Sequence, residues 1–294
     1  MLWAAATIAA AGFQVARNAL QRGMMSRTGP WGATLVRFLF GLPFSLLLLG
    51  GALAFGPAVH PSFGWPFWWP ALTGALAQVL ATAALLLAMH HAGFAVGTAL
   101  QQSSVPLAAL AGLLVFGDDL SALGWAGVAV TTLGLGVLVW PKRVEGTHRA
   151  GLGIAFGVAS GLMFGFALNA FRHAGLRLEP HHPLFAALAS VAIVQAVQAG
   201  GLGLYLAWRD RPALAAVFRD WRESLGAGLC GALASSGWFF ALVLAPAAAV
   251  RALGVIEMPI AALAGHRLFR EGLTPRQVLG VLAVTAGVAM TASF

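Results

Sequence analysis

Ionisable and amide side chains inside long apolar runs are the residues of this sequence whose chemistry calls for an explanation. Glu257 is the clearest case, because it lies ten residues into the apolar run 247–269 and two residues before Pro259. Such a group is costly in a hydrocarbon environment, so it usually faces the inside of a helix bundle and marks a functional site. We expect Glu257 to bind a proton or an amine, and the alternative is a structural carboxylate paired with Arg251.

Two prolines, Pro106 and Pro259, occupy equivalent places in two apolar runs. A proline removes one hydrogen bond of a helix and frees a backbone carbonyl. The freed carbonyls would lie beside residues 101–104 (Gln-Gln-Ser-Ser) in the first run and beside Glu257 in the second, where they could accept hydrogen bonds from a ligand. An ordinary kink that only shapes packing is the alternative.

A polar stripe runs along the first apolar segment. Gln14, Arg17, Asn18 and Gln21 have the spacing i, i+3, i+4 and i+7, which places them on one helical face. We interpret this stripe as one wall of a substrate cavity rather than as a hydrogen-bonded seam between helices. The residues expected to line that cavity are Gln14, Asn18, Gln78, Gln101, Ser104, Ser235, Trp238 and Glu257.

Catalytic and metal-binding patterns fit these residues poorly. The sequence contains Ser-Ser-Gly at 235–237 and His-His at 90–91, but neither a nucleophile elbow nor an HExxH motif. Its one cysteine, Cys230, lies in an apolar run, so neither a disulfide framework nor a zinc cluster is expected. We therefore expect no enzyme activity, no metal and no other cofactor.

The elements that must position these residues are membrane-spanning helices. Of the 294 residues, 60% are hydrophobic and only 9% are charged, whereas an ordinary soluble domain has about 25% charged residues. The apolar residues come in runs of about 20, the length that crosses about 30 Å of hydrocarbon as a helix. The net charge of +8 comes from basic residues scattered at the ends of these runs, so it indicates a membrane protein and not a nucleic-acid-binding one.

The runs predict an all-α integral membrane protein with ten transmembrane helices. The predicted spans are residues 2–22, 32–55, 68–90, 94–116, 122–140, 152–172, 183–208, 225–244, 247–269 and 275–292. A short interfacial helix is expected between residues 209 and 224, with Val217 and Trp221 on one side. Glycine recurs every four residues from Gly153 to Gly165 in the sixth span, so we expect a close helix–helix seam there.

The two halves of the chain, residues 1–140 and 151–294, are related, and the segment 141–150 is the polar linker between them. Residues 106–138 and 259–291 agree at 12 of 33 positions without a gap, beginning with the shared motif P-x-A-A-L-A-G. Because each half has five spans, an odd number, the second half must enter the membrane in the opposite direction. Such inverted repeats are typical of secondary transporters, whose substrate site lies near the bilayer midplane.

The tail of each repeat resembles the EamA-type repeat of the drug/metabolite transporter superfamily. The similar residues are the P-x-A-A-L-A-G motifs at 106–112 and 259–265 and the Gly-Val and Gly positions that follow them. Pro30 and the Arg-Phe pair at 37–38 add to the resemblance in the first half. The resemblance implies a fold of two inverted five-helix bundles that moves metabolites or amino acids.

Two features qualify the resemblance. The family carries Gly-Glu at the corner between the last two spans of a repeat, whereas this chain has Gly-Asp at 117–118 and Arg-Glu at 270–271, which we interpret as structural caps. The positive-inside count places both termini outside the cytoplasm, because most Arg and Lys residues lie in the connections on the other side. The resemblance implies the opposite orientation, and we favour the charge count.

Together the patterns predict a secondary transporter in a bacterial inner membrane, a multi-pass protein that acts as a monomer or a homodimer. Its expected substrates are small metabolites such as amino acids, export is the favoured direction, and Glu257 is the candidate for proton coupling. Two alternatives remain open, a non-transporting membrane scaffold and an intramembrane enzyme. A continuous polar cavity that reaches the midplane would favour the transporter over the scaffold.

Overall fold

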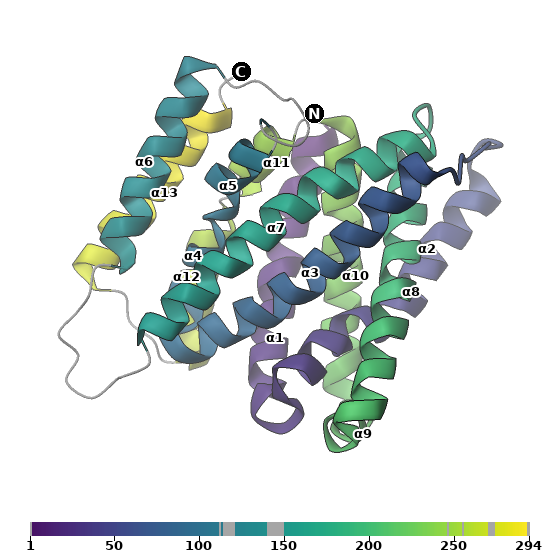
Figure 1. The fold of residues 1–294 in the computed structure, drawn as a ribbon, viewed down its shortest axis with the longest axis horizontal. Helices are drawn as coiled ribbons and strands as arrows, with labels where there is room; N and C mark the ends of the chain where they lie inside the picture. The colour runs from purple at the N-terminus through teal and green to yellow at the C-terminus, as the bar shows by residue number, and fades with distance from the viewer. Residues whose placement is uncertain are drawn as a thin grey trace. The chain divides into compact units, whose positions relative to one another are not determined.

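The computed structural model describes residues 2–111, 113, 121–139, 150–245, 247–254, 256–269 and 274–292. All regular secondary structure in these residues is helical, as Figure 1 shows. The helices are α1 (Leu2–Leu39), α2 (Leu42–Phe55), α3 (Trp65–Ala92), α4 (Phe94–Gln101), α5 (Ser104–Ala111), α6 (Ala122–Val139), α7 (Ala150–Leu178), α8 (Pro183–Arg209), α9 (Arg211–Arg219), α10 (Trp221–Leu244), α11 (Ala247–Gly254), α12 (Glu257–Phe269) and α13 (Pro275–Ala292). The predicted all-α class is confirmed.

Helix occupies most of the described residues of every predicted span. Within the described residues, five stretches are long and apolar enough to cross a membrane, namely Leu2–Phe55, Trp65–Ala92, Gly151–Leu178, Pro183–Arg209 and Trp221–Leu244. The apolar parts of α6 and α13 are shorter, at Ala122–Gly134 and Val278–Gly287. The predicted fourth and ninth spans are each divided between two short helices, α4 and α5 in one and α11 and α12 in the other.

The first two predicted spans are joined by a bend inside α1 rather than by a loop. The bend lies at Gly29, whose φ of 66° falls in the left-handed region that glycine tolerates. Pro30 follows, and a proline keeps the residue before it out of the right-handed helical region. The chain therefore turns at these two residues, and the rest of α1 continues with α2 as the second span.

Two spans are interrupted near their middle at equivalent places of the repeat. In the first half α4 ends at Gln101 and α5 begins at Ser104, and the same kind of break separates α11 from α12 in the second half. Pro106 and Pro259 are each the third residue of the helix that follows the break. A proline costs little in the first turn of a helix, where backbone N–H groups lack a helical partner, whereas inside a continuous helix it removes a hydrogen bond and clashes.

The chain forms two compact units, and each contains spans from both sequence halves. Unit 1 comprises residues Met1–Val79 and Ala170–Pro246, and unit 2 comprises Leu80–Asn169 and Ala247–Phe294. Unit 1 thus holds α1, α2 and α8–α10, unit 2 holds α4–α6 and α11–α13, and the borders fall within α3 and α7. The predicted division at the linker concerns the sequence repeat and stays a prediction; residues 141–149 lie outside the described part of the chain.

Within unit 2, α6 and α13 pack together through glycines at equivalent repeat positions. A Cβ placed on Gly134 would lie 2.6 Å from the backbone nitrogen of Val284, and one placed on Gly287 would lie 2.6 Å from Thr131 Oγ1. The repeat pairs Gly134 with Gly287 and Thr131 with Val284, so the two close approaches are equivalent contacts, one from each copy of the repeat. The two helices are antiparallel, because residue numbers rise along one as they fall along the other, which is the inverted relation expected of the repeat.

Another close approach in unit 2 follows the glycines of α7. A Cβ on Gly153 would lie 2.9 Å from Ala92 Cβ, at the end of α3, and a Cβ on Gly157 would lie 2.5 Å from Leu100 Cβ in α4. Small residues every four positions let helix backbones approach closely. The seam expected along the sixth span is therefore present, and it holds α7 against the helix that leads into the first break.

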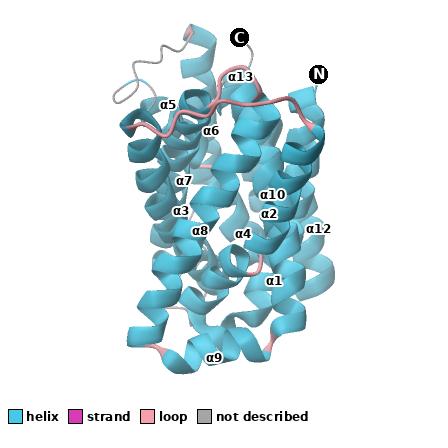
Figure 2. Cartoon of the chain, turned by 90° about the vertical axis from the view of Figure 1, so that its right-hand side faces the viewer, coloured by secondary structure: helices cyan, strands magenta, loops and turns pink. Residues whose placement is uncertain are grey.

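The short helix α9 belongs to unit 1 and runs crosswise between α8 and α10 (Figure 2). Asp210 caps it, since its side chain accepts a hydrogen bond from the backbone N–H of Ala213 at 3.0 Å. Val217 is fully buried in a cluster with Met24 and other apolar side chains. The interfacial helix was predicted from the sequence, but Trp221 does not share its buried side, because this residue is half exposed and begins α10.

Candidate functional site

The break cluster of unit 2, which we define as Gln102, Ser104, Arg251 and Glu257, brings together buried polar side chains. Arg251 Nη2 donates to Gln102 Oε1 at 3.0 Å and to Ser104 Oγ at 3.1 Å, and it lies 3.7 Å from Glu257 Oε1. Gln102 Nε2 donates to the same carboxylate oxygen. Glu257 is fully buried and Arg251 is 3% exposed, so the acid and the base are both held away from solvent.

The interrupted helices position this cluster. Gln102 lies between α4 and α5, Ser104 begins α5, and Glu257 begins α12. Because α4 packs against α12 and α5 against α11, the two breaks face each other and their polar residues meet. Breaking a buried ion pair by removing one partner costs about 3–5 kcal/mol, so the mutual pairing is what makes these ions tolerable here.

The structure bears on both interpretations of Glu257. The pairing with Arg251 that we weighed as the structural alternative is present, and a binding or proton-coupling role of the carboxylate stays a prediction. Ser104, its counterpart in the repeat, contacts the same guanidinium. Gln101 was predicted for the site, and it is buried but lies outside the cluster, with no hydrogen-bond partner for its Oε1 among the described residues. Gln102, one residue further on, takes that place.

The arginine cluster of unit 1, which we define as Arg17, Asn18, Arg37 and Ser235, is the second buried polar group. Arg17 donates to Asn18 Oδ1 from Nε at 3.2 Å and from Nη2 at 2.7 Å, and Arg37 Nη2 donates to Ser235 Oγ at 3.4 Å. Arg17 is 1% exposed and Arg37 is 2% exposed, so Arg17 does not reach toward a membrane surface. Asn18 and Ser235 are among the site residues that the sequence predicts, whereas Arg37 is not among them and belongs only to the Arg-Phe pair at 37–38.

The other site residues predicted in unit 1 are buried in the same unit. Gln14 and Trp238 are each 5% exposed. Gln78 joins two helices, because its Oε1 accepts a hydrogen bond from Gln198 Nε2 of α8 at 2.9 Å. Gln21, a further member of the polar stripe, donates to the backbone carbonyl of Ala33 at 2.6 Å across the bend of α1. Gln21 therefore contributes to a seam between the two arms of α1, which is the alternative that we weighed, and the interpretation of the stripe as a cavity wall stays a prediction.

Five of the eight predicted cavity residues thus lie in unit 1 and three in unit 2, and the prediction that all eight line one cavity stays a prediction. A cavity of about 750 Å³ in unit 1 contains none of them. Leu48, Phe55, Leu184 and Phe240 are among its mainly apolar lining residues, and they come from α2, α8 and α10. Both predicted caps, Gly117-Asp118 and Arg270-Glu271, lie outside the described residues.

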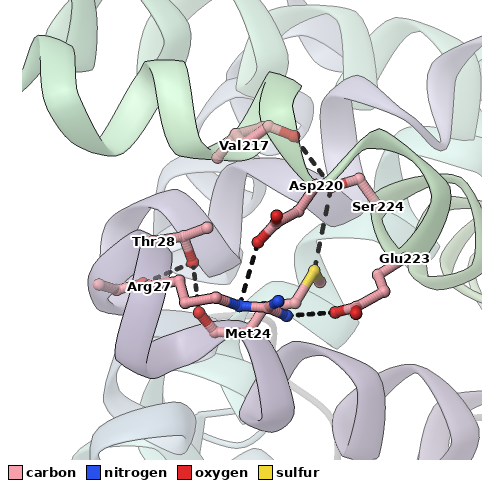
Figure 3. Close-up of polar contacts among 8 residues, drawn as sticks. Met24, Arg27, Thr28, Val217, Asp220, Glu223 and Ser224 are labelled. Carbon is pink, nitrogen blue, oxygen red and sulfur yellow. Dashed lines mark hydrogen bonds and ion pairs between the residues drawn. The ribbon is translucent and has the colours of Figure 1, made fainter.

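Charged residues at the α9 end of unit 1 form a separate exposed group, drawn in Figure 3. Arg27 Nε lies 3.1 Å from Asp220 Oδ2, and its Nη2 also pairs with Glu223. Beside them, Ser224 Oγ donates to the backbone carbonyl of Val217 at 3.1 Å, which joins α10 to α9. Exposed pairs of this kind contribute at most about 1 kcal/mol each, so we assign this group to packing at a helix end rather than to the site.

Comparisons with known proteins agree with this architecture. The chain is similar over 98% of its length to 98% of one solved chain, described as "Crystal structure of protein", with a TM-score of 0.61 and 16% sequence identity. At that identity the likeness shows the fold alone. No curated protein matches the sequence significantly. Residues 151–293 match the model of the EamA-like transporter family, so the second half of the chain is similar to that family.

Proposed function

We propose that this chain is a secondary transporter that exports small metabolites, such as amino acids, across a bacterial inner membrane. The observation that carries the proposal is the pair of interrupted spans in unit 2, whose broken ends hold buried polar side chains from both repeats. Irregular backbone and ionisable groups at membrane depth are tolerated where they line a cavity or an ion pathway. Discontinuous helices at equivalent places of two repeats are typical of transporter binding sites.

Glu257 is the group that we propose for proton coupling. Its carboxylate accepts a hydrogen bond from Gln102 and lies 3.7 Å from Arg251 Nη2. Adding a proton would remove the negative charge and weaken the attraction to Arg251. Because both breaks meet at this cluster, a change of charge on Glu257 would alter the polar groups that the broken helix ends present to a substrate.

The first experiment identifies substrates. Cells that express the protein are compared with cells that carry an empty vector, and the metabolites released into the medium are measured over time. We expect specific metabolites to be released faster by the expressing cells. A full-length protein that is inserted in the membrane and changes the release of no metabolite would favour the scaffold alternative.

The second experiment tests coupling at Glu257. Flux of a released metabolite is measured in proteoliposomes with and without an imposed pH gradient, for the wild type and for Glu257→Gln. Glutamine keeps the volume and an oxygen that can accept from Gln102, so we expect a folded protein whose flux no longer responds to the gradient. The matched control is Glu223→Gln, an exposed acid whose loss should leave the response unchanged.

Two results would separate the parts of this proposal. If Glu257→Gln responds to the pH gradient as the wild type does, Glu257 is not the coupling group. If the wild type itself carries the metabolite without responding to the gradient, the protein is a facilitator, and the break cluster then has at most a binding role.

A further inference from the structure

Basic and aromatic side chains gather around the short helix α9, which joins α8 to α10 at one end of unit 1 (Figure 2). We call them the α9 patch, and its members are Trp208, Arg209, Arg211, Arg219, Trp221 and Arg222. The four arginines are exposed, and the two tryptophans are 78% and 50% exposed. An exposed tryptophan beside each end of a short crosswise helix is typical of the level where hydrocarbon meets lipid headgroups.

The opposite side of α9 is packed against the rest of unit 1. Ala213 and Val217 are buried, and a Cβ on Gly32 of α1 would lie 3.3 Å from Val217 Cγ2. The ring of Phe218 lies 6.0 Å from that of Phe40, centroid to centroid, but Phe218 is still 54% exposed. These contacts fix the orientation of α9, so the patch faces away from the protein.

The acidic residues at this end of unit 1 are engaged by other groups. Asp220 and Glu223 pair with Arg27, and Asp210 accepts a hydrogen bond from the backbone N–H of Ala213. Within the described part of the chain, the four patch arginines form no ion pair with a carboxylate. The patch therefore presents positive charge to its surroundings, although this end of the unit carries charges of both signs.

Two of the patch arginines lie beside tryptophan rings. The guanidinium carbon of Arg209 is 5.2 Å from the ring centroid of Trp208, and that of Arg222 is 5.4 Å from the ring centroid of Trp221. A guanidinium group on an aromatic face keeps its N–H donors, and these can bind a phosphate through paired hydrogen bonds. Each pair thus combines a phosphate-binding group with an apolar ring.

We infer that the α9 patch binds the headgroups of anionic phospholipids. Their phosphate oxygens accept from guanidinium groups, and their net negative charge complements the patch, whereas the amine of a zwitterionic headgroup cancels that charge. Free phosphate would supply the same oxygens but no acyl chains to contact the exposed tryptophans and Phe218. Each arginine near an anionic surface strengthens binding about fivefold. The inference does not depend on the proposed transport function.

Lipid binding is measured by native mass spectrometry on the purified full-length protein in detergent. The probes are phosphatidylglycerol and phosphatidylcholine with the same acyl chains, and inorganic phosphate is the competitor. We expect the wild type to bind phosphatidylglycerol at least about fivefold more tightly than phosphatidylcholine. Raising the salt concentration should weaken this preference, because salt screens exposed charges.

Four variants assign the binding to the patch. Arg219→Gln and Arg222→Gln should each weaken phosphatidylglycerol binding about fivefold, and the double variant about 25-fold. Arg222→Lys keeps the charge, so it should retain most of the binding. The matched control is Arg177→Gln, which removes an exposed arginine of the same unit from the last turn of α7, outside the patch, and should leave binding unchanged.

The substituted side chains are exposed, so the variants should keep the unfolding temperature of the wild type when no lipid is added. This separates a loss of lipid binding from a folding defect. The inference is wrong if phosphatidylcholine binds as tightly as phosphatidylglycerol, if the double variant binds like the wild type, or if Arg177→Gln loses as much as Arg219→Gln. Displacement of phosphatidylglycerol by an equal concentration of inorganic phosphate would also overturn it, because the ligand would then be free phosphate and not a lipid.

Discussion

Replacing Arg251 by glutamine is expected to destabilise the protein through Glu257, because it leaves a fully buried carboxylate without its cationic neighbour. The charges are 3.7 Å apart in the structure. At about that separation two unit charges attract by about 4 kcal/mol when the effective dielectric constant is about 20. This agrees with the cost of about 3–5 kcal/mol for breaking a buried pair. Glutamine can still contact Gln102 and Ser104, so we expect a loss near the lower limit.

The assay is thermal unfolding of the purified protein in detergent, for the wild type, Arg251→Gln, Glu257→Gln and the double variant. A loss of about 3 kcal/mol corresponds to a fall in unfolding temperature on the order of 10 °C. The double variant replaces both ions by neutral groups, so it should be more stable than Arg251→Gln alone. The coupling obtained from the four proteins should be about 1–3 kcal/mol.

An additive result would refute this reasoning. If the double variant is destabilised by the sum of the two single losses, Arg251 and Glu257 do not stabilise each other, and the break cluster is not an ion pair in the folded protein. Arg27→Gln provides the comparison, because its exposed pairs with Asp220 and Glu223 predict a loss of at most about 1 kcal/mol.

Two further predictions concern packing and pH. Gly134→Ala should lower the unfolding temperature by several degrees, because its Cβ would lie 2.6 Å from the backbone nitrogen of Val284. Gly136→Ala should leave the unfolding temperature unchanged, because nothing lies within 4 Å of a Cβ at that position. Thermal unfolding of the two variants measures both effects. Hydrogen bonding, chiefly from the backbone N–H of His181, lowers the pKa of the Glu179 carboxyl in the folded protein. The stability that these hydrogen bonds contribute is therefore fully present above the unfolded-state pKa of about 4.3, and it is lost as the pH falls through the lower, folded-state pKa. The protection of the His181 amide against hydrogen exchange, taken relative to the intrinsic exchange rate at each pH, should therefore decrease in acid, and Glu179→Gln should abolish that decrease.

The spans, and the places where two of them depart from a regular helix, could be predicted because they follow from local chemistry. Runs of about 20 apolar residues specify membrane-crossing helices whatever their neighbours are. Pro106 and Pro259 also act locally, since a proline inside a span either kinks the helix or begins a new one. The equivalent placement of the two prolines in the repeat indicated equivalent distortions of two continuous spans; the structure instead divides each span into two helices, with the proline in the first turn of the second.

The partners of the polar side chains could not be predicted in the same way. Gln101 was preferred to Gln102, but helical periodicity does not hold across the break between α4 and α5, so the direction of a side chain there cannot be read from spacing. Arg17 and Arg37 are 20 positions apart, and only the bend at Gly29 brings their side chains to the same part of α10. Such contacts depend on how distant segments pack, which a single sequence does not specify.

The most direct test of the central claim is the initial rate of metabolite flux in proteoliposomes. The substrate is a metabolite that expressing cells release, and protein-free liposomes are the reference. The transporter account predicts a flux that saturates with substrate concentration, exceeds the reference, and is altered by Glu257→Gln but not by Glu223→Gln. A wild-type flux equal to that of protein-free liposomes for every metabolite released by the cells would contradict it.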